Sequence, residues 1–327
     1  MCCSDIHLVG PISRTEATQL RRLVPGSVVF TDRADCLALA TGPEHTCVFL
    51  HGGRCGLHGT RKKPAICRQF PFSLIATPLG ARVTTAHRCT CRLLGDRPLI
   101  DLREARASLS GSDGKVRATA RVGDRIPLSP RTSISFSSYA CAEAPLLERL
   151  AAGEAPSAVL GVPPSLPTSR GPTWAQVAET FRGGDVGTGG FHAAMACFGH
   201  GLRLLRDNTD AAPPRPWAPW FDAAEAAAPV PETASAVLGD WAADMVWDLR
   251  WAVRSSFDVL CMDLQVRWMV ASALANRWQA EGARADRAAA EAVLVVDSVG
   301  EAPLWRQALP FMSHQGRWST RMPLLPV

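Results

Sequence analysis

The sequence predicts an α+β protein in which a small cysteine-rich domain precedes an all-α helical domain. Eight of the 11 cysteines lie within the first 91 residues, so the first third of the chain differs chemically from the rest. From Trp174 onward, apolar residues recur with the period of an α-helix. A chain of 327 residues, 47% hydrophobic and 20% charged, is long enough for two packed domains. This composition excludes a disordered chain, a collagen and a small disulfide-stapled protein.

The predicted cysteine-rich domain, residues 1–110, mixes short helices with short strands. A helix is expected over 14–23, because Ser13 can serve as its N-cap and Glu16 stands in the capping-box position. The other elements expected in this domain are three strands and one helix, over 27–31, 47–51, 80–87 and 98–109.

The middle segment, residues 111–173, is expected to contain a hairpin, a short helix and a Pro-rich linker. Alternating patterns predict its two strands over 115–122 and 132–137, paired across 123–130. The short helix is expected over 145–152. The linker follows over 151–173, where five prolines and many small residues interrupt regular structure.

Residues 174–327 are predicted to form the helical domain. The expected helices are separated by two Pro-rich breaks and lie over 174–182, 190–206, 217–227, 233–255, 257–281 and 303–309. All ten tryptophans lie at Trp174 or later. Five of them recur through the long helices, which predicts a core of large aromatic side chains: Trp241, Trp247, Trp251, Trp268 and Trp278.

The N-terminus lacks a basic segment followed by an apolar one, and no window of about 18 uncharged apolar residues exists. The sequence therefore predicts a cytoplasmic protein without a membrane span. In a reducing compartment, clustered cysteines are expected to be metal ligands or catalytic thiols rather than disulfides.

The cysteines converge on one motif, CVFLHGGRCGLHGTRKKPAICRQFPF over 47–72, followed by HRCTC over 87–91. Thiolates placed at turns and loop ends suit zinc or an iron–sulfur cluster. Gly52 and Gly53 would let the chain reverse between Cys47 and Cys55. The alternative interpretation is that cysteines are small buried hydrophobes, which suits four that lie outside the motif: Cys36, Cys141, Cys197 and Cys261.

This motif resembles the signature of the YkgJ-type cysteine-cluster family, described as a zinc- or iron-chelating domain, and flagellin lysine-N-methylases carry a related cluster. The resemblance covers residues 2–92 and implies a small cysteine-rich metal-binding domain followed by the all-α helical domain. It implies metal-ligand roles for Cys2, Cys3, Cys47, Cys55, Cys67, Cys89 and Cys91. The family pattern opens with a further cysteine, so we expect the true start to lie upstream of Met1.

A basic block coincides with the cysteine motif. Eight basic residues and no Asp or Glu lie between Cys47 and Arg92, which leaves 27 basic and 30 acidic residues elsewhere in the chain. Three interpretations stay open: cations that offset an anionic metal–thiolate site and lower thiol pKa values, an anion-binding face, or a solvated surface. The cations proposed to flank ligand cysteines are Arg54, Arg68, Arg88 and Arg92. Nucleic-acid binding is not favoured, because the block has few aromatic residues and no known reading motif.

Three functional hypotheses follow. The first is a metal-binding protein that holds zinc or an iron–sulfur cluster. The second, by analogy with the methylases, is an S-adenosylmethionine-dependent protein lysine N-methyltransferase-like enzyme with a protein substrate, although no methyltransferase nucleotide motif or catalytic residue is identified. The third is a zinc-stabilised interaction module.

Other chemical candidates are weaker. The glycine-rich stretch 183–190 precedes a helix and is interpreted as a helix connection rather than a phosphate loop. His192, Cys197 and His200 share one predicted helix and are expected to be packed rather than to bind a metal. The histidines among the cysteines are expected to support the metal ligands rather than to bind the metal themselves: His51, His58 and His87.

Overall fold

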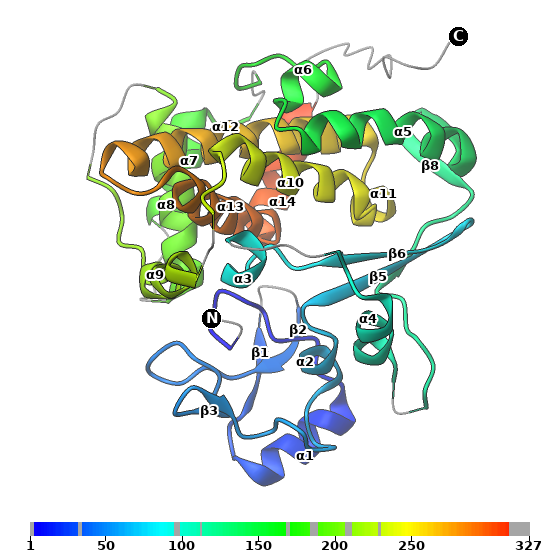
Figure 1. Ribbon diagram of the computed structural model, residues 1–327, viewed down its shortest axis with the longest axis vertical. Helices are drawn as coiled ribbons and strands as arrows, with labels where there is room; N and C mark the ends of the chain where they lie inside the picture. The colour runs from blue at the N-terminus through cyan, green and yellow to red at the C-terminus, as the bar shows by residue number, and fades with distance from the viewer. Residues whose placement is uncertain are drawn as a thin grey trace.

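The computed structural model describes residues 3–31, 35–94, 99–111, 113–167, 171–183, 189–206, 211–227 and 230–313. Figure 1 shows the helices of the C-terminal half packed together at one end and the first 70 residues at the other, with strands β5 and β6 between them. The prediction of a mixed α and β chain with a helical C-terminal half is confirmed. The metal-binding character of the N-terminal part and the boundaries at 110 and 173 stay predictions.

The helices of the N-terminal third are short. They are α1 (Arg14–Leu23), α2 (Ala65–Gln69), α3 (Thr90–Leu93) and α4 (Leu102–Leu109). Those of the remaining chain are α5 (Phe136–Ala151), α6 (Pro156–Leu160), α7 (Trp174–Gly183), α8 (Gly190–Leu204), α9 (Ala218–Ala227), α10 (Ala234–Trp247), α11 (Arg250–Arg254), α12 (Phe257–Ala280), α13 (Ala285–Gly300) and α14 (Pro303–Ser313).

The strands form small separate sheets. They are β1 (Val28–Thr31), β2 (Cys36–Leu39), β3 (Leu50–His51), β4 (Arg54–Cys55), β5 (Phe72–Thr77), β6 (Gly80–Thr85), β7 (Ala120–Arg121), β8 (Arg125–Ser129) and β9 (Thr132–Ser135). Antiparallel pairs join β1 to β2, β3 to β4, β5 to β6 and β8 to β9, and β7 adds to β5 in parallel.

Helix α1 forms as the sequence predicts. The Ser13 hydroxyl accepts a hydrogen bond from the Glu16 backbone N–H, and the Glu16 carboxylate accepts one from the Ser13 N–H, which completes the capping box. Of the strand predicted over 47–51, only β3 exists, and Lys115–Val122 does not pair with Thr132–Ser137. The hairpin instead joins β8 to β9, whereas β7 pairs with β5. Local alternation identified β7 and β9 as extended, but β8 lies within 123–130, which was expected to connect the two strands, and the partners were not identified.

Helix α13 is the main element that the sequence analysis missed, although it lies at the centre of the helices. It packs against α8, α10 and α12, and residues from Ala288 to Val296 are fully or nearly fully buried. Its segment AAAEAVLVV is a nearly continuous apolar run with one charged residue, Glu291, and such a run does not by itself distinguish a buried helix from a buried strand. The helix predicted over 233–255 is also interrupted, because Leu249 takes a left-handed φ of 57° between α10 and α11.

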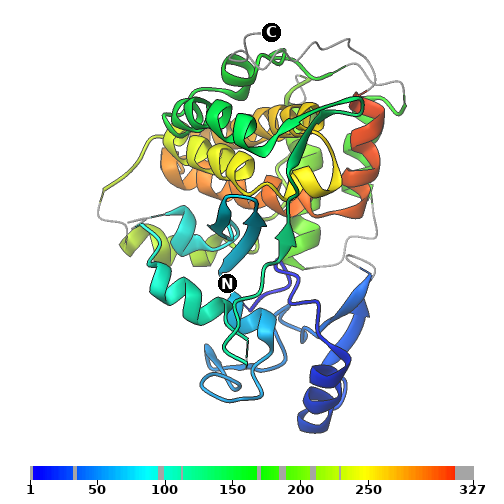
Figure 2. The ribbon, with the colours of Figure 1, turned by 90° about the vertical axis from the view of Figure 1, so that its right-hand side faces the viewer.

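The buried hydrophobic side chains form two separate cores. The smaller core is built from Ile12, Leu20, Val28, Phe49 and Leu57, with Cys3, Cys47, Cys55 and Cys67 packed in or against it. The larger core runs through the helices and also receives Ile6, Ile75 and Leu93 from the N-terminal third. Of the tryptophans predicted to be core, Trp241, Trp251, Trp268 and Trp278 are buried, and Trp247 is half-buried. Figure 2 shows the two parts from a second side, still at opposite ends.

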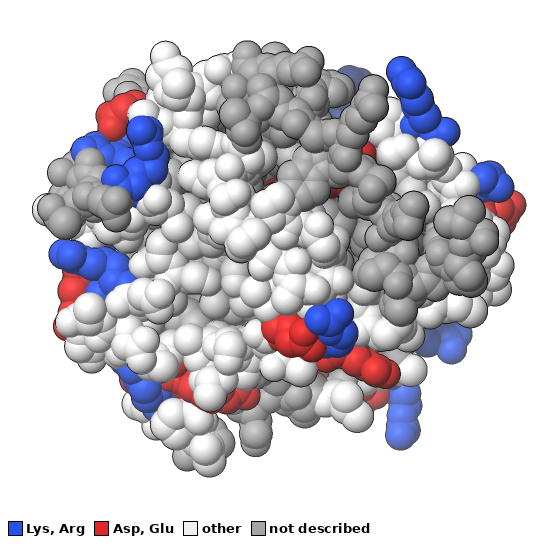
Figure 3. All heavy atoms as spheres, turned by 90° about the horizontal axis from the view of Figure 1, so that it is seen from above, with Lys and Arg blue, Asp and Glu red and all other residues white. Residues whose placement is uncertain are grey.

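The helical end has little charge at its centre. Figure 3 looks onto this end, where most of the charged side chains that are described lie toward the margin and one group of acidic and basic side chains lies nearer the middle. Within the described part of the chain, no helix is both long and apolar enough to cross a membrane.

Candidate metal centre

Four of the predicted ligand cysteines are collected at the smaller core: Cys3, Cys47, Cys55 and Cys67, called here the thiol group. The first two are joined through the backbone, because the Cys47 N–H donates to the Cys3 carbonyl at 2.6 Å. Residues 3–5 thus run alongside 45–47, where the Asp5 N–H donates to the His45 carbonyl. The pairing of residues 3–5 with residues 45–47 therefore places Cys3 at the motif, although the two segments are far apart in sequence.

The β3–β4 hairpin positions Cys55. It pairs Cys55 with Leu50, and the turn between the strands is made by Gly52 and Gly53, whose φ values are 54° and 73°. Side chains other than glycine rarely adopt these angles, which explains the Gly-Gly pair at this reversal. The prediction that the two glycines reverse the chain is confirmed.

Helix α2 carries Cys67 and is fastened to α1. The Ala65 N–H at the start of α2 donates to the Glu16 carboxylate at 2.8 Å, so the residue that caps α1 also binds the first turn of α2. Burial of the Glu16 carboxyl opposes ionisation, but hydrogen bonds from Ala65 and Ser13 outweigh it and lower its pKa. The capping box is therefore also part of the scaffold that holds Cys67 in place.

The members of the thiol group interact electrostatically. Burial, followed by the proximity of Cys47, Cys3 and Cys55, raises the pKa of Cys67 to about 12, and Lys63 opposes this only in part. Burial likewise raises the pKa of Cys47; a backbone hydrogen bond from Phe49 acts against this, while Cys3 and Cys55 add to it. Because neighbouring thiolates would repel one another, Cys47 and Cys67 favour the protonated form unless a cation is present.

The thiol group does not form a closed ligand shell. Among the described residues, no three His, Cys, Asp or Glu side chains are arranged to hold one metal ion. Cys2 lies outside the described part of the chain. The four thiols suit zinc or iron by their chemistry, and binding would require their sulfurs to draw together.

The other two predicted ligands lie on α3. Cys89 is buried directly before this helix, and Cys91 is exposed on it. Helix α3 contacts α9 and α13, and Figure 1 shows it beneath the larger core rather than beside α2 and β3. The predicted ligands therefore divide between the thiol group and α3.

Comparisons with protein-family models, with curated proteins and with solved structures find no match to this chain. The resemblance to the YkgJ-type family accordingly stays a prediction.

Much of the basic block faces carboxylates of the helices rather than the thiol group. Arg92 pairs with Asp240 at 2.5 Å and Asp244 at 2.8 Å, and the His87 Nε2 lies 2.8 Å from the Asp244 carboxylate. Arg88 pairs with Asp297 on α13 at 3.2 Å and with Glu301, which directly follows α13, at 2.7 Å. We call this set of seven residues the junction.

The junction corrects the interpretation of the nearby arginines. In one of the three interpretations, Arg88 and Arg92 offset a metal–thiolate charge and lower thiol pKa values, but their charges are matched by helix acids, and the pKa values of Cys47 and Cys67 are raised. Arg54 is exposed, and the Arg68 guanidinium donates to the Lys63 carbonyl. The acids that pair with Arg88 and Arg92 could have been recognised in the sequence. They recur four residues apart, at 240 and 244 and again at 297 and 301, which places each pair on one face of a helix.

Acid is expected to weaken the junction. Burial disfavours the charged forms of Asp244 and Asp297, but His87 and Arg92 lower the pKa of Asp244, and Arg88 lowers that of Asp297. A carboxyl with a lowered pKa stabilises the fold above its ordinary pKa of about 3.9, and this contribution is lost as the pH falls through the lowered value. Urea unfolding should therefore show a loss of stability below about pH 4. Arg88→Met should make that loss shallower, and an unchanged acid profile in the variant would contradict the assignment.

The end of the glycine-rich stretch 183–190 binds a carboxylate of the same chain. Residues 184–188 lie outside the described part, but the Gly190 N–H at the start of α8 donates to the Asp5 carboxylate at 3.0 Å. A Cβ on Gly189 would lie 1.8 Å from an Asp5 carboxylate oxygen, so a side chain there would displace Asp5. This helix N-terminus binds a protein carboxylate.

The remaining candidates are mostly structural. Cys197 and Cys261 are fully buried, as expected of small hydrophobes, but that expectation is wrong for Cys141, which is exposed, and Cys36 is only partly buried. His200 is buried and His192 is exposed on α8. The two remaining motif histidines, His51 and His58, are also exposed.

Proposed function

We propose that this protein binds zinc or an iron–sulfur cluster through Cys3, Cys47, Cys55 and Cys67. The observation that supports the proposal is the thiol group itself: four thiols from separate segments meet at one small core, and the neighbouring thiols contribute to the raised pKa values of Cys47 and Cys67. Unrelated buried cysteines would pack as isolated hydrophobes, as Cys197 and Cys261 do.

A metal would relieve the electrostatic cost of this arrangement. Zinc and iron bind thiolates, so binding displaces the thiol protons and places a cation among groups that otherwise repel when ionised. Lys63 and the backbone near Phe49 already favour the thiolates of Cys67 and Cys47. In this proposal, α1, α2 and the β3–β4 hairpin orient the thiols, and the smaller core shields them from water.

The other predicted ligands, Cys2, Cys89 and Cys91, extend the same proposal. A single four-ligand site needs none of them, whereas a second metal would need further donors near α3. The lysine N-methyltransferase-like and interaction-module hypotheses also stay predictions, and no contact described above favours S-adenosylmethionine or a protein substrate over metal binding. The predicted cytoplasmic location and the expectation of no nucleic-acid partner are likewise unchanged.

Metal content decides the proposal. Protein purified without oxygen should contain about one zinc per chain with no visible absorption, or about four irons with a broad visible band. Elemental analysis together with the UV–visible spectrum distinguishes the two metals, and a content well above these values would indicate a second site. A preparation free of stoichiometric zinc and iron, which also binds neither after anaerobic reconstitution, would refute the proposal.

A further inference from the structure

A cavity on the helical part of the molecule is lined by residues that the proposed metal centre does not use. Its volume is about 280 Å³, and it lies between α7 and the end of α8. The lining residues combine one aromatic ring, two small side chains and three charged groups: Trp174, Ala175, Ala178, Glu179, Arg203 and Arg206. An aromatic wall with a few convergent polar groups is typical of small-molecule sites.

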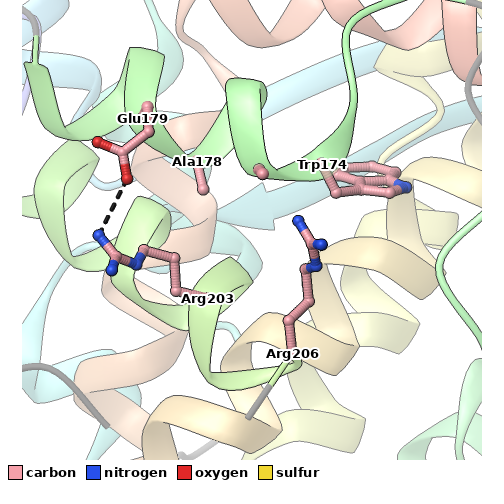
Figure 4. A pocket seen from close by; sticks show the side chains of 6 residues that line it. Trp174, Ala178, Glu179, Arg203 and Arg206 are labelled. Carbon is pink, nitrogen blue, oxygen red and sulfur yellow. Dashed lines mark hydrogen bonds and ion pairs between the residues drawn. The ribbon is translucent and has the colours of Figure 1, made fainter. Parts of the chain in front are cut away.

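The aromatic wall is held in a fixed orientation. The Trp174 indole N–H donates to the Pro167 carbonyl at 2.7 Å, which uses the single donor of the ring. The indole can therefore offer the cavity only its π-system. Figure 4 shows it at one end of the cavity, above the guanidinium of Arg206.

Among the described residues that line the cavity, cationic side chains outnumber anionic ones. Glu179 is engaged by Arg203 at 2.9 Å, the contact drawn in Figure 4, and by Arg182 at 3.6 Å. Arg206 is exposed, and within the described ranges no carboxylate forms an ion pair with it. The described lining thus contains two guanidinium groups and one carboxylate, and the Arg206 guanidinium points toward the indole.

We propose that this cavity binds a small planar aromatic anion, with its carboxylate or phosphate group on Arg206 and its ring against Trp174. A guanidinium recognises both anionic groups through paired N–H donors, and an indole face stacks on a flat ring. Ala175 and Ala178 leave room for the ring because their side chains are short. A volume of about 280 Å³ lies at the lower end of ligand pockets, which suits one or two fused rings rather than a dinucleotide.

Calorimetric titration of the full chain tests the proposal. The probes are naphthalene-2-carboxylate and 2-naphthyl phosphate, compared with neutral 2-naphthol and with the saturated, non-planar decahydronaphthalene-2-carboxylate. Both aromatic anions should bind, the two control compounds should bind at least tenfold more weakly, and added salt should weaken the anions. The tighter of the two anions identifies the group, carboxylate or phosphate, that Arg206 prefers.

Two variants and a matched control assign the binding to this cavity. Arg206→Gln should weaken the aromatic anions about tenfold or more, and Trp174→Leu should remove the preference for planar rings. Arg254→Gln replaces an exposed arginine on α11 and should leave binding unchanged. Because Arg206 is exposed, its variant should keep the wild-type circular dichroism and metal content, which separates this test from that of the metal centre. The proposal would be overturned if neither aromatic anion binds. It would also be overturned if wild type and Arg206→Gln bind the anions equally well.

Discussion

Cys67→Ser is expected to remove metal from the purified protein while leaving the larger core folded. Cys67 has the most strongly raised pKa in the thiol group, at about 12, so its thiolate depends most on a bound cation. Changes to groups that merely support ligands cost about 10–100-fold in metal affinity, and loss of a ligand should cost more. Elemental analysis measures the loss of metal.

The structural effect should be confined to the smaller core. Hydrogen exchange should lose protection in α1, α2 and β1 to β4, because structural metal sites contribute folding free energy directly. Tryptophan fluorescence should change little, since all ten tryptophans lie at Trp174 or later. Cys141→Ser, at an exposed position on α5, is the matched control and should keep its metal. Full metal content in Cys67→Ser would exclude Cys67 as a ligand.

Arg82→Met is expected to destabilise the fold by about 3–5 kcal/mol, because it leaves a buried carboxylate without its partner. Arg82 on β6 pairs with Glu143 on α5 through two contacts, at 2.7 and 2.9 Å, and both side chains are buried. The same guanidinium donates to the Trp247 carbonyl at 3.1 Å and lies 4.1 Å from the centre of its ring. One side chain thus connects the β5–β6 hairpin to two helices.

The double variant Arg82→Met, Glu143→Leu should recover most of the lost stability, because both charges are then replaced by apolar groups. Burial raises the pKa of Glu143 even with Arg82 beside it, so the carboxylate is costly without a cation. Urea unfolding followed by circular dichroism gives the free energies. Arg121→Met, at an exposed position on β7, should be nearly neutral. A single variant as stable as this control would show that the buried pair contributes nothing.

Local patterns identified the elements whose signals are local. The capping box at Ser13 and Glu16 specified the start of α1, and the Gly52–Gly53 pair specified the reversal before Cys55. Helix α13 was not predicted, because its nearly continuous apolar run AAAEAVLVV is equally compatible with a buried strand. The partner of β9 escaped because strand pairing depends on the turn and the packing of both strands, which alternation does not record.

The sequence predicted which residues could bind a metal, but it did not predict which of them lie together in the fold. Residue type and spacing singled out the cysteines, yet only the fold shows Cys3 beside Cys47 and assigns Cys89 and Cys91 to α3. The same holds for the basic block, whose partners Asp244 and Asp297 are more than 150 residues away in sequence. The cavity at Trp174 and Arg206 gave no sequence signal, because its lining comes from two helices that meet only in the folded chain.

The positions of the two cores along the chain have a consequence for biosynthesis. The smaller core is complete once residue 67 has emerged from the ribosome, whereas the larger core needs α13, which ends at Gly300. Because chains are made from the N-terminus and the parts made first can fold first, the cysteine-rich part has most of the translation time in which to acquire an ion. The junction, which joins the α3 region to the helices, would then form after the cysteine-rich part is already loaded.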